Sequence, residues 1–209
     1  MKPLSIVVLI SGGGTTLNNL LTYHDNGQLP VRFVGVVSSN HQAKGLKYAQ
    51  QRQIDHQVLR RRDFSSPEAH RDSVFDYCRK QQADIVIMGG YLEHLLIPQD
   101  YQHRVINIHP SLIPAFCGLG FYGHRVHQAV LDFGAKVSGC TVHFVDNQYD
   151  HGPIIAQRAC PVLDNDSAET LAARVFQLEC QLLPKCITAI AEDRIKVSHN
   201  RTRGFESLA

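Results

Sequence analysis

Short apolar runs alternate with amphipathic stretches through the first half of the chain. Runs rich in β-branched residues predict strands at residues 5–10, 32–37, 56–59, 84–88 and 105–108. Helical spacing predicts helices at residues 42–52 and 67–82, and the second begins with two serines, a proline and an acid. This alternation is typical of βαβ units built around a parallel sheet.

The second half of the chain also contains two stretches with helical spacing of apolar residues. A Gly-rich stretch at residues 117–123 precedes a predicted helix whose apolar positions recur at helical spacing through residues 126–133. A final helix is expected from about Ser167, with Pro184 kinking or dividing it.

Two long extended runs separate these helices. They cover residues 136–145 and 153–162, and a polar connection at residues 146–152 would join them as an antiparallel pair. We therefore expect an α/β fold with a Rossmann-like, mostly parallel sheet, helices on both faces and an antiparallel C-terminal extension. A single domain over residues 1–209 is the default for this length.

Composition narrows the choice of partners. The net charge is only +2, with acids and bases interspersed, so we expect neither nucleic acid nor a membrane as partner, and a small ligand instead. The six cysteines are scattered without a C-x-x-C pair, which favours reduced thiols over disulfides or a zinc site. The apolar run at residues 4–10 is too short for a membrane span and lacks a signal-peptide cleavage region, so we expect a cytoplasmic protein.

A Gly-rich turn follows the first predicted strand and precedes a helix. It contains Gly12, Gly13, Gly14, Thr15 and Thr16. Backbone N–H groups in such a turn, together with a helix N-terminus, can face an anion, which suggests a phosphate site. The turn matches neither G-x-G-x-x-G nor the Walker pattern, so a plain tight β-α turn stays open as the alternative.

The strongest candidate for chemistry lies where the fifth predicted strand ends. Asn107 and His109 are two positions apart, so their side chains share one face of that strand. Asp150 lies in the polar connection, where a carboxylate near an imidazole would favour the protonated ring and fix its orientation. An amide, an imidazolium and a carboxylate suit acyl transfer to an amine without a protein nucleophile. Taken singly, each could merely satisfy buried backbone groups.

Several other polar residues are more simply interpreted as structural or surface residues than as parts of a site. Ser111 lacks the G-x-S-x-G elbow and is interpreted as a turn residue. His124 and His127 lack the H-E-x-x-H pattern, which favours packing or surface positions over a zinc site. Glu179 borders the apolar face of the last helix, where a solvated carboxylate is the default. The basic tail from Arg194 onward is interpreted as a solvated end.

Residues 10–17, 107–114 and 138–157 together carry a resemblance to a known family. The chain resembles the phosphoribosylglycinamide formyltransferases, which belong to the folate-dependent formyltransferases, over about residues 4–195. The resemblance implies formyl transfer from 10-formyltetrahydrofolate to the amine of glycinamide ribonucleotide in de novo purine biosynthesis, without a metal. It also implies that Asn107, His109 and Asp150 are the catalytic residues, with Asp150 raising the pKa of the histidine.

The resemblance implies binding roles as well. Gly14, Thr15 and Thr16 would hold the ribonucleotide phosphate, and Glu179 would meet the ribose hydroxyls. The folate would lie between two segments, which comprise Leu92, Glu93, His94 and Leu95, and Asp146, Asn147, Gln148, Tyr149 and Asp150. The domain would then have a phosphate-binding half at about residues 1–100, a catalytic and folate half at about 101–195, and a short tail at 196–209.

Three features depart from the family pattern. Glu93 and Pro67 stand where basic residues are common, so the glutamate tail of the folate would be held differently or more weakly. The stretch at residues 116–127 is longer than in the simplest family pattern. It would form either a lid over the substrate or a longer surface loop.

Rival functions stay open at this point. They are formylation of another amine, hydrolysis of 10-formyltetrahydrofolate, a non-catalytic nucleotide-binding protein and, with little support, a zinc hydrolase. The sequence is compatible with a monomer or a homodimer.

Overall fold

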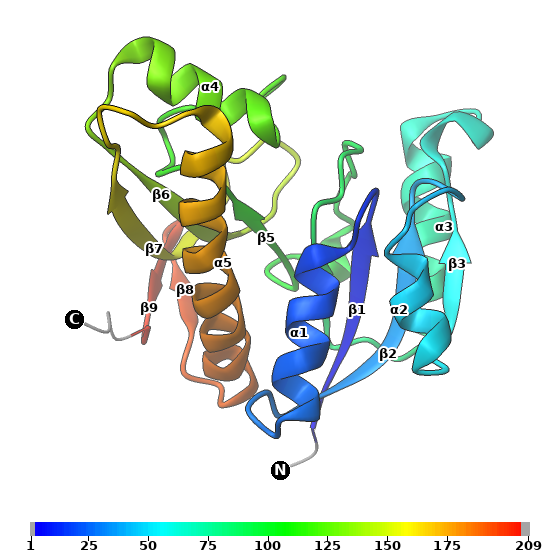
Figure 1. The fold of residues 1–209 in the computed structure, drawn as a ribbon. Coiled ribbons are helices and arrows are strands. Elements are labelled where there is room, and N and C mark those ends of the chain that lie inside the picture. Colours follow the sequence, from blue (N-terminus) through cyan, green and yellow to red (C-terminus); the bar gives the residue numbers. More distant parts are fainter. Residues whose placement is uncertain (1–2, 206–209) are drawn as a thin grey trace. The chain divides into compact units, whose positions relative to one another are not determined.

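The chain divides after Asn107 into two units, residues 1–107 and 108–209 (Figure 1). The structure is a computed structural model, and it describes residues 3–205. Within that range no helix combines the length and the apolar character needed to cross a membrane. The six cysteines all lie in the described part and are free thiols.

The first unit is organised around parallel strands. These are β1 (Leu4–Ile10), β2 (Val31–Ser38), β3 (His56–Val58), β4 (Ile85–Met88) and β5 (Val105–His109), in the order β3-β2-β1-β4-β5. Residues 6–10 and the whole of β4 are buried, which is why these segments read as continuous apolar runs. All five predicted strands are confirmed in position.

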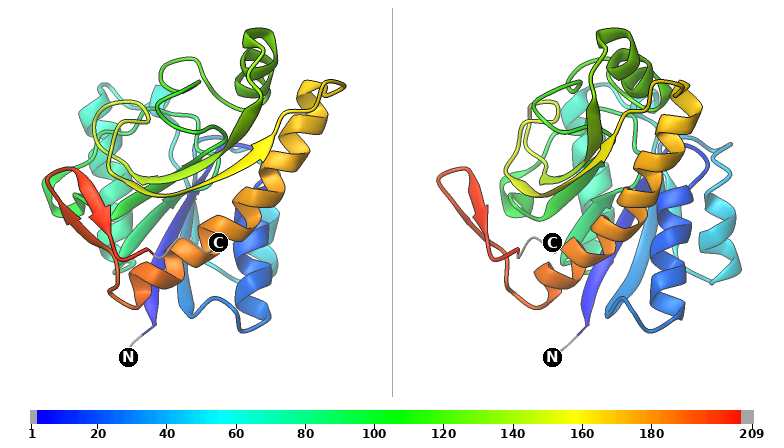
Figure 2. Two further views of the ribbon diagram at one scale, coloured as in Figure 1. Left: turned by 90° about the vertical axis from the view of Figure 1, so that its left-hand side faces the viewer. Right: turned by 60° about the vertical axis from the view of Figure 1, so that its left-hand side comes forward.

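Helices cover both faces of this sheet. They are α1 (Thr15–Asp25), α2 (Leu46–Gln51) and α3 (Pro67–Lys80), with short 3₁₀ turns at Arg61–Asp63 and Gln99–Tyr101. The chain moves outward from β1 to β3 through α1 and α2 and then returns to β4 through α3, so α1 and α2 lie on one face and α3 on the other (Figure 2). The helix predicted from residue 67 begins there, with the Ser66 hydroxyl accepting the Ala69 N–H at 3.1 Å.

The helix predicted over residues 42–52 is wrong in its first turn. The observed helix α2 begins at Leu46, and the preceding residues form turns. The Asn40 side chain accepts the Gln42 N–H at 3.0 Å, and the Gly45 N–H donates to the Gly12 carbonyl at 3.0 Å. These contacts hold the segment in turns against the Gly-rich turn and so override its helical propensity.

An antiparallel pair and two helices make up most of the second unit. They are α4 (His124–Phe133), β6 (Val137–Phe144), β7 (Ile154–Pro161) and α5 (Ala168–Ala191). The strands pair from Val137 with Pro161 to His143 with Ile154. Helix α5 packs against both strands and α4. The parallel strands, the helices on both faces and this antiparallel pair confirm the predicted α/β fold class.

Helix α5 begins as the sequence predicts but does not divide. Ser167 and Thr170 form a capping box, in which each side chain accepts the other's backbone N–H. Pro184 lies inside the helix, which continues to Ala191. A proline inside a helix costs about 3 kcal/mol. The buried side chains of Leu182, Leu183 and Ile187 surround it and offset that cost, at roughly 1.5–3 kcal/mol each.

The basic residues of the tail are exposed, as expected of a solvated end, but the tail also has a regular structure that was not predicted. Residues 196–203 form a two-stranded hairpin, with β8 (Lys196–Ser198) paired to β9 (Arg201–Arg203). His199 and Asn200 both have positive φ, which is the backbone that a tight two-residue hairpin turn requires. The Thr202 hydroxyl donates to the Ile154 carbonyl and ties the hairpin to β7. Residues 206–209 of the expected tail lie outside the described range.

Replacing Leu171 with alanine tests the packing of α5. Its side chain is fully buried, so the truncation should lower the free energy of unfolding by about 2–5 kcal/mol. Leu163→Ala, at a side chain that is 48% exposed, is the matched control and should cost much less. Urea denaturation measures both changes, and equal losses would contradict the packing described here.

Candidate active site

His109 ends strand β5 in a buried position, with the ring 4% exposed. Its Nε2 lies 2.9 Å from the carbonyl oxygen of Phe116. The intervening turn is held by Ser111, whose hydroxyl donates to the Ala115 carbonyl at 2.6 Å. Ser111 is therefore the turn residue that the sequence indicates, and it helps to keep the Phe116 carbonyl against the ring.

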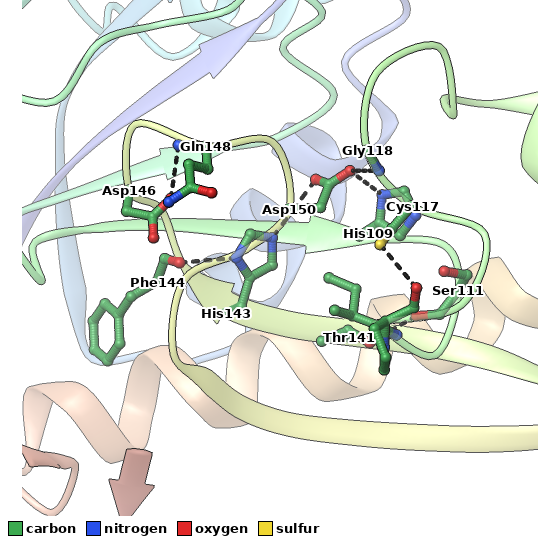
Figure 3. Close-up of polar contacts among 12 residues, drawn as sticks. His109, Ser111, Cys117, Gly118, Thr141, His143, Phe144, Asp146, Gln148 and Asp150 are labelled. Carbon is green, nitrogen blue, oxygen red and sulfur yellow. Dashed lines mark hydrogen bonds and ion pairs between the residues drawn. The ribbon is translucent and has the colours of Figure 1, made fainter. Parts of the chain in front are cut away.

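Thr141 on β6 holds this turn in place through a hydroxyl that makes all the hydrogen bonds it can. The hydroxyl donates to the Ser111 carbonyl at 2.7 Å, and it accepts the Ile113 N–H at 3.1 Å and the Gln157 amide at 2.9 Å. One donor and two lone pairs are thus all used. The turn after β5 is consequently fixed to the antiparallel pair by buried hydrogen bonds (Figure 3).

Asp150 faces the other nitrogen of the same ring. Its Oδ2 lies 3.5 Å from His109 Nδ1 and also accepts the Gly118 N–H at 2.8 Å (Figure 3). The side chain is largely buried, and the backbone of Asp150 has a φ of 49°, which is uncommon for a residue other than glycine. The structure therefore brings together two of the residues that the sequence analysis selects as catalytic.

The surroundings of His109 suit a ring that carries two protons. A carbonyl oxygen faces Nε2 and a carboxylate faces Nδ1, and both groups only accept hydrogen bonds. A neutral imidazole has one N–H donor, whereas the imidazolium has two. The ring is thus held in one orientation by an acceptor at each nitrogen.

His143 is a site residue that the sequence analysis missed. Its Nε2 lies 3.9 Å from Asp150 Oδ1, and its Nδ1 is 2.8 Å from the Phe144 carbonyl oxygen. Burial lowers the pKa of this imidazole, which favours the neutral ring. The available signal was a histidine between the apolar residues Val142 and Phe144 of a predicted strand, where a buried polar group needs a partner.

Asn107 and Glu179 belong to different units. Asn107 precedes His109 by two positions on β5, is half-buried and pairs with Met88 of β4 in the strand register. Glu179 lies half-buried on α5, and burial raises the pKa of its carboxyl to about 8. It is therefore not the solvated carboxylate that the helix pattern alone predicts.

The Gly-rich turn lies between β1 and α1 in the first unit. Gly12, Gly13 and Thr15 are exposed, and α1 begins after Gly14 without a side-chain cap. The Ser11 hydroxyl lies 2.6 Å from that of Ser39 and accepts the Leu92 N–H at 2.8 Å. The turn is thus fixed from one side while uncapped N–H groups of the first helical turn face outward, as an anion site requires.

The side chains of the two segments expected to meet the folate differ in how far they are exposed. Leu92 is 61% exposed, Glu93 and His94 are half-buried and Leu95 is buried. In the other segment, Tyr149 is exposed while Asp146 is half-buried.

Hydrogen bonds shape the second segment. The Asp146 side chain accepts the Gln148 N–H at 2.8 Å, and its other oxygen lies 2.7 Å from His151 Nδ1. The exposed Asn147 lies within this turn.

The stretch at residues 116–127 is tied to the site at its start. Phe116 and Gly118 contact His109 and Asp150 through their backbones, whereas Leu119 is 78% exposed.

The two histidines of α4 have different surroundings. The exposed His124 lies 2.7 Å from Glu169 Oε1. His127 is buried, and burial lowers its pKa to about 4. Among residues 3–205, no group of three or more histidines, cysteines and acids is placed to hold a metal ion.

Known proteins are similar to this chain in sequence and in fold. Residues 4–187 match a family described as formyl transferase. The chain is 39% identical to the chloroplastic phosphoribosylglycinamide formyltransferase of Vigna unguiculata, covering 91% of this chain but only 62% of that protein. It is 34% identical to the phosphoribosylglycinamide formyltransferase of Haemophilus influenzae, over 93% and 91% of the two chains. Glycinamide ribonucleotide transformylase 1 from Symbiobacterium toebii has a TM-score of 0.91 and 35% identity, with 98% and 95% covered.

Gly14→Ala tests the tight fit of the Gly-rich turn, with Gly27→Ala as its matched control. Both glycines have nearly the same positive φ, 69° and 70°, so each alanine pays about 1–2 kcal/mol for that backbone. A Cβ at position 14 would also lie 2.5 Å from the Gly45 Cα, whereas one at position 27 meets nothing within 4 Å. Urea denaturation should show Gly14→Ala as the more destabilised by about 1–3 kcal/mol, and equal losses would contradict the close approach.

Proposed function

The chain belongs to the formyl transferase family, and we propose that it transfers the formyl group of 10-formyltetrahydrofolate to the amine of glycinamide ribonucleotide. This reaction is a step of de novo purine biosynthesis, and we place it in the cytoplasm. The substrates are small molecules. The donor supplies an activated formyl carbon, and the chain's own residues supply orientation, charge and a proton.

One observation carries the proposal. The His109 ring is buried between the Phe116 carbonyl at 2.9 Å and the Asp150 carboxylate at 3.5 Å. Attack by the amine forms a bond between its nitrogen and the formyl carbon, and negative charge develops on the formyl oxygen. An imidazolium held in a water-poor position stabilises such charge far better than a solvated one, because little reorganisation is needed.

Asn107 supplies the second polar group of the proposed site. Its position two residues before His109 on one strand places both side chains on the same face, where the amide can donate to the same oxyanion. The bond between the formyl carbon and the donor nitrogen then breaks. The imidazolium of His109 gives its proton to the departing donor nitrogen, and the proton that the amine releases then restores it.

Two sets of residues, each considered by itself, are chemically suited to parts of the ribonucleotide. The uncapped N-terminus of α1 and the exposed amides of Gly12 and Gly13 suit its phosphate. A Glu179 carboxyl with its pKa near 8 can hold a proton at neutral pH, so it can both donate to and accept from ribose hydroxyls.

The folate segments fit a flat heterocycle with a polar edge. Exposed Leu92 and Tyr149 offer apolar surface, and the backbone of residues 92–95 and 146–150 offers hydrogen-bonding groups.

Formyl transfer assays with and without glycinamide ribonucleotide test the function. The release of tetrahydrofolate should depend on the ribonucleotide and should equal the amount of formylated product. Release of formate without the ribonucleotide would instead establish hydrolysis. Transfer to other amines at the same rate would overturn the proposed acceptor.

His109→Ala should lower kcat by roughly a hundredfold or more, with a much smaller change in KM. The reason is that its interaction strengthens as charge develops in the transition state. His56→Ala, an exposed histidine on β3, is the control and should keep the wild-type kcat. Steady-state kinetics measure both constants, and a rise in KM at unchanged kcat would contradict a catalytic role for His109.

Asp150→Asn should lower kcat by about tenfold or more, equivalent to about 1.4 kcal/mol in activation free energy. The amide keeps the shape of the side chain and can still accept the Gly118 N–H, but it brings no negative charge to the ring. Asp164→Asn is the matched control because that carboxylate is exposed and, among residues 3–205, forms an ion pair only with Lys136. A wild-type kcat in Asp150→Asn would remove the carboxylate from the mechanism.

A further inference from the structure

Gln157 on strand β7 reaches the turn that follows β5. It pairs with Thr141 of β6 in the strand register, and cross-strand partners project from the same face of a pair. Its side-chain amide nitrogen lies 2.9 Å from the Ile113 carbonyl oxygen and 2.9 Å from the Thr141 hydroxyl oxygen. An amide nitrogen carries two hydrogens, so both are used on these two acceptors.

The exposed position of Gln157 makes these two bonds informative. Water could serve the amide there in place of the protein, so folding does not require it to find internal partners. The two direct bonds fix one segment instead. Thr141 also accepts the Ile113 N–H at 3.1 Å. Both backbone groups of Ile113 are therefore held by the pair of Thr141 and Gln157.

The turn needs such an anchor because Phe116 is strained. Its φ is 51°, a left-handed value that is uncommon for an aromatic residue. Strained backbone persists only where surrounding contacts hold it. The Ser111 hydroxyl supplies contacts within the turn, at 2.6 Å from the Ala115 carbonyl oxygen and 3.3 Å from that of Phe116. Ile113 supplies the contact to the strands. The carbonyl that faces His109 thus depends on bonds made earlier in the turn.

We propose that Gln157 is a positioning residue for His109, because its amide holds the turn so that the Phe116 carbonyl stays on Nε2 of the ring. The inference rests on the proposed function, in which the ring stabilises charge on the formyl oxygen. Gln157 bonds to the turn and to Thr141, so it acts through the Phe116 carbonyl and not on the reacting atoms. Misplacing a catalytic group by about 1 Å can cost roughly a hundredfold in rate.

The two acceptors define which side chain can hold this place. The Thr141 hydroxyl already gives its hydrogen to the Ser111 carbonyl at 2.7 Å, and the Ile113 carbonyl has none to give. Both therefore need a donor. Glutamate has the shape of glutamine but only accepts hydrogen bonds when ionised, whereas methionine has a similar length with neither charge nor N–H. The two substitutions separate a loss of donors from a gain of charge.

Gln157→Glu and Gln157→Met should each lower kcat by about tenfold, while the KM of either substrate changes by less than about twofold. Steady-state formyl transfer from 10-formyltetrahydrofolate to glycinamide ribonucleotide measures both constants. Gln128→Glu is the matched control and should keep the wild-type kcat, because its amide also donates a hydrogen bond at an exposed position, to Asp132 on α4. A loss of kcat in Gln157→Glu without one in Gln157→Met would assign the effect to the new charge and overturn the proposal.

The His109→Ala background distinguishes positioning from a general structural role. If Gln157 acts through the ring, Gln157→Met should lower kcat no further once the ring is absent. If it only stabilises the fold, the substitution should reduce activity by the same factor in both backgrounds, and that result would overturn the proposal. Urea denaturation of each variant measures the fraction that is folded under the assay conditions.

Amide hydrogen exchange followed by NMR tests the anchor without turnover. The Ile113 N–H, which donates to Thr141, should exchange about tenfold faster or more in Gln157→Met, because opening of the turn no longer breaks the two amide bonds. The N–H of Val175, a buried residue inside α5, should keep its rate. Unchanged exchange at Ile113 would overturn the anchoring role. Absence of formyl transfer in the wild-type protein would overturn the proposed function instead, so the two failures are distinguishable.

Discussion

The site in the second unit depends on one buried imidazole, that of His109, which has a hydrogen-bond acceptor at each of its two nitrogens. The Phe116 carbonyl reaches His109 only when the turn after β5 is closed, and the Asp150 carboxylate reaches it only when the connection between β6 and β7 is closed. Losing either partner leaves a buried polar atom unsatisfied, at a cost of about 1–3 kcal/mol. Two segments distant in sequence are thus held to one ring, and Thr141 adds buried bonds that keep the first of them in place.

The fold was largely predictable because its core strands are continuous apolar runs and its longest helices have strong caps. Residues 42–45 were predicted wrongly because they carry helical spacing but are held by contacts to the Gly-rich turn. There tertiary contacts outweighed a local preference. The hairpin at residues 196–203 was missed because its turn is made by His199 and Asn200 rather than by glycine.

The site was predictable where side chains define it and unpredictable where the backbone does. The spacing of Asn107 and His109 along one strand is a local property that the sequence displays directly. Asp150 required the inference that a polar connection would return to the same place. The Phe116 carbonyl and the Gly118 N–H could not be found in this way, because every residue carries these groups and only the fold selects which ones face a ring.

Strand β3 has a consequence for the protein's behaviour at high concentration. It forms the outer edge of the first unit's sheet, it is only three residues long, and His56 and Gln57 are exposed. An edge strand presents unpaired N–H and C=O groups that can recruit a strand from another molecule. An edge this short offers few such groups and covers residues 36–38 of β2, whereas β1, whose buried apolar run would pair readily with other strands, lies inside the sheet. The order of the strands thus keeps the most apolar strand of the first unit away from other molecules.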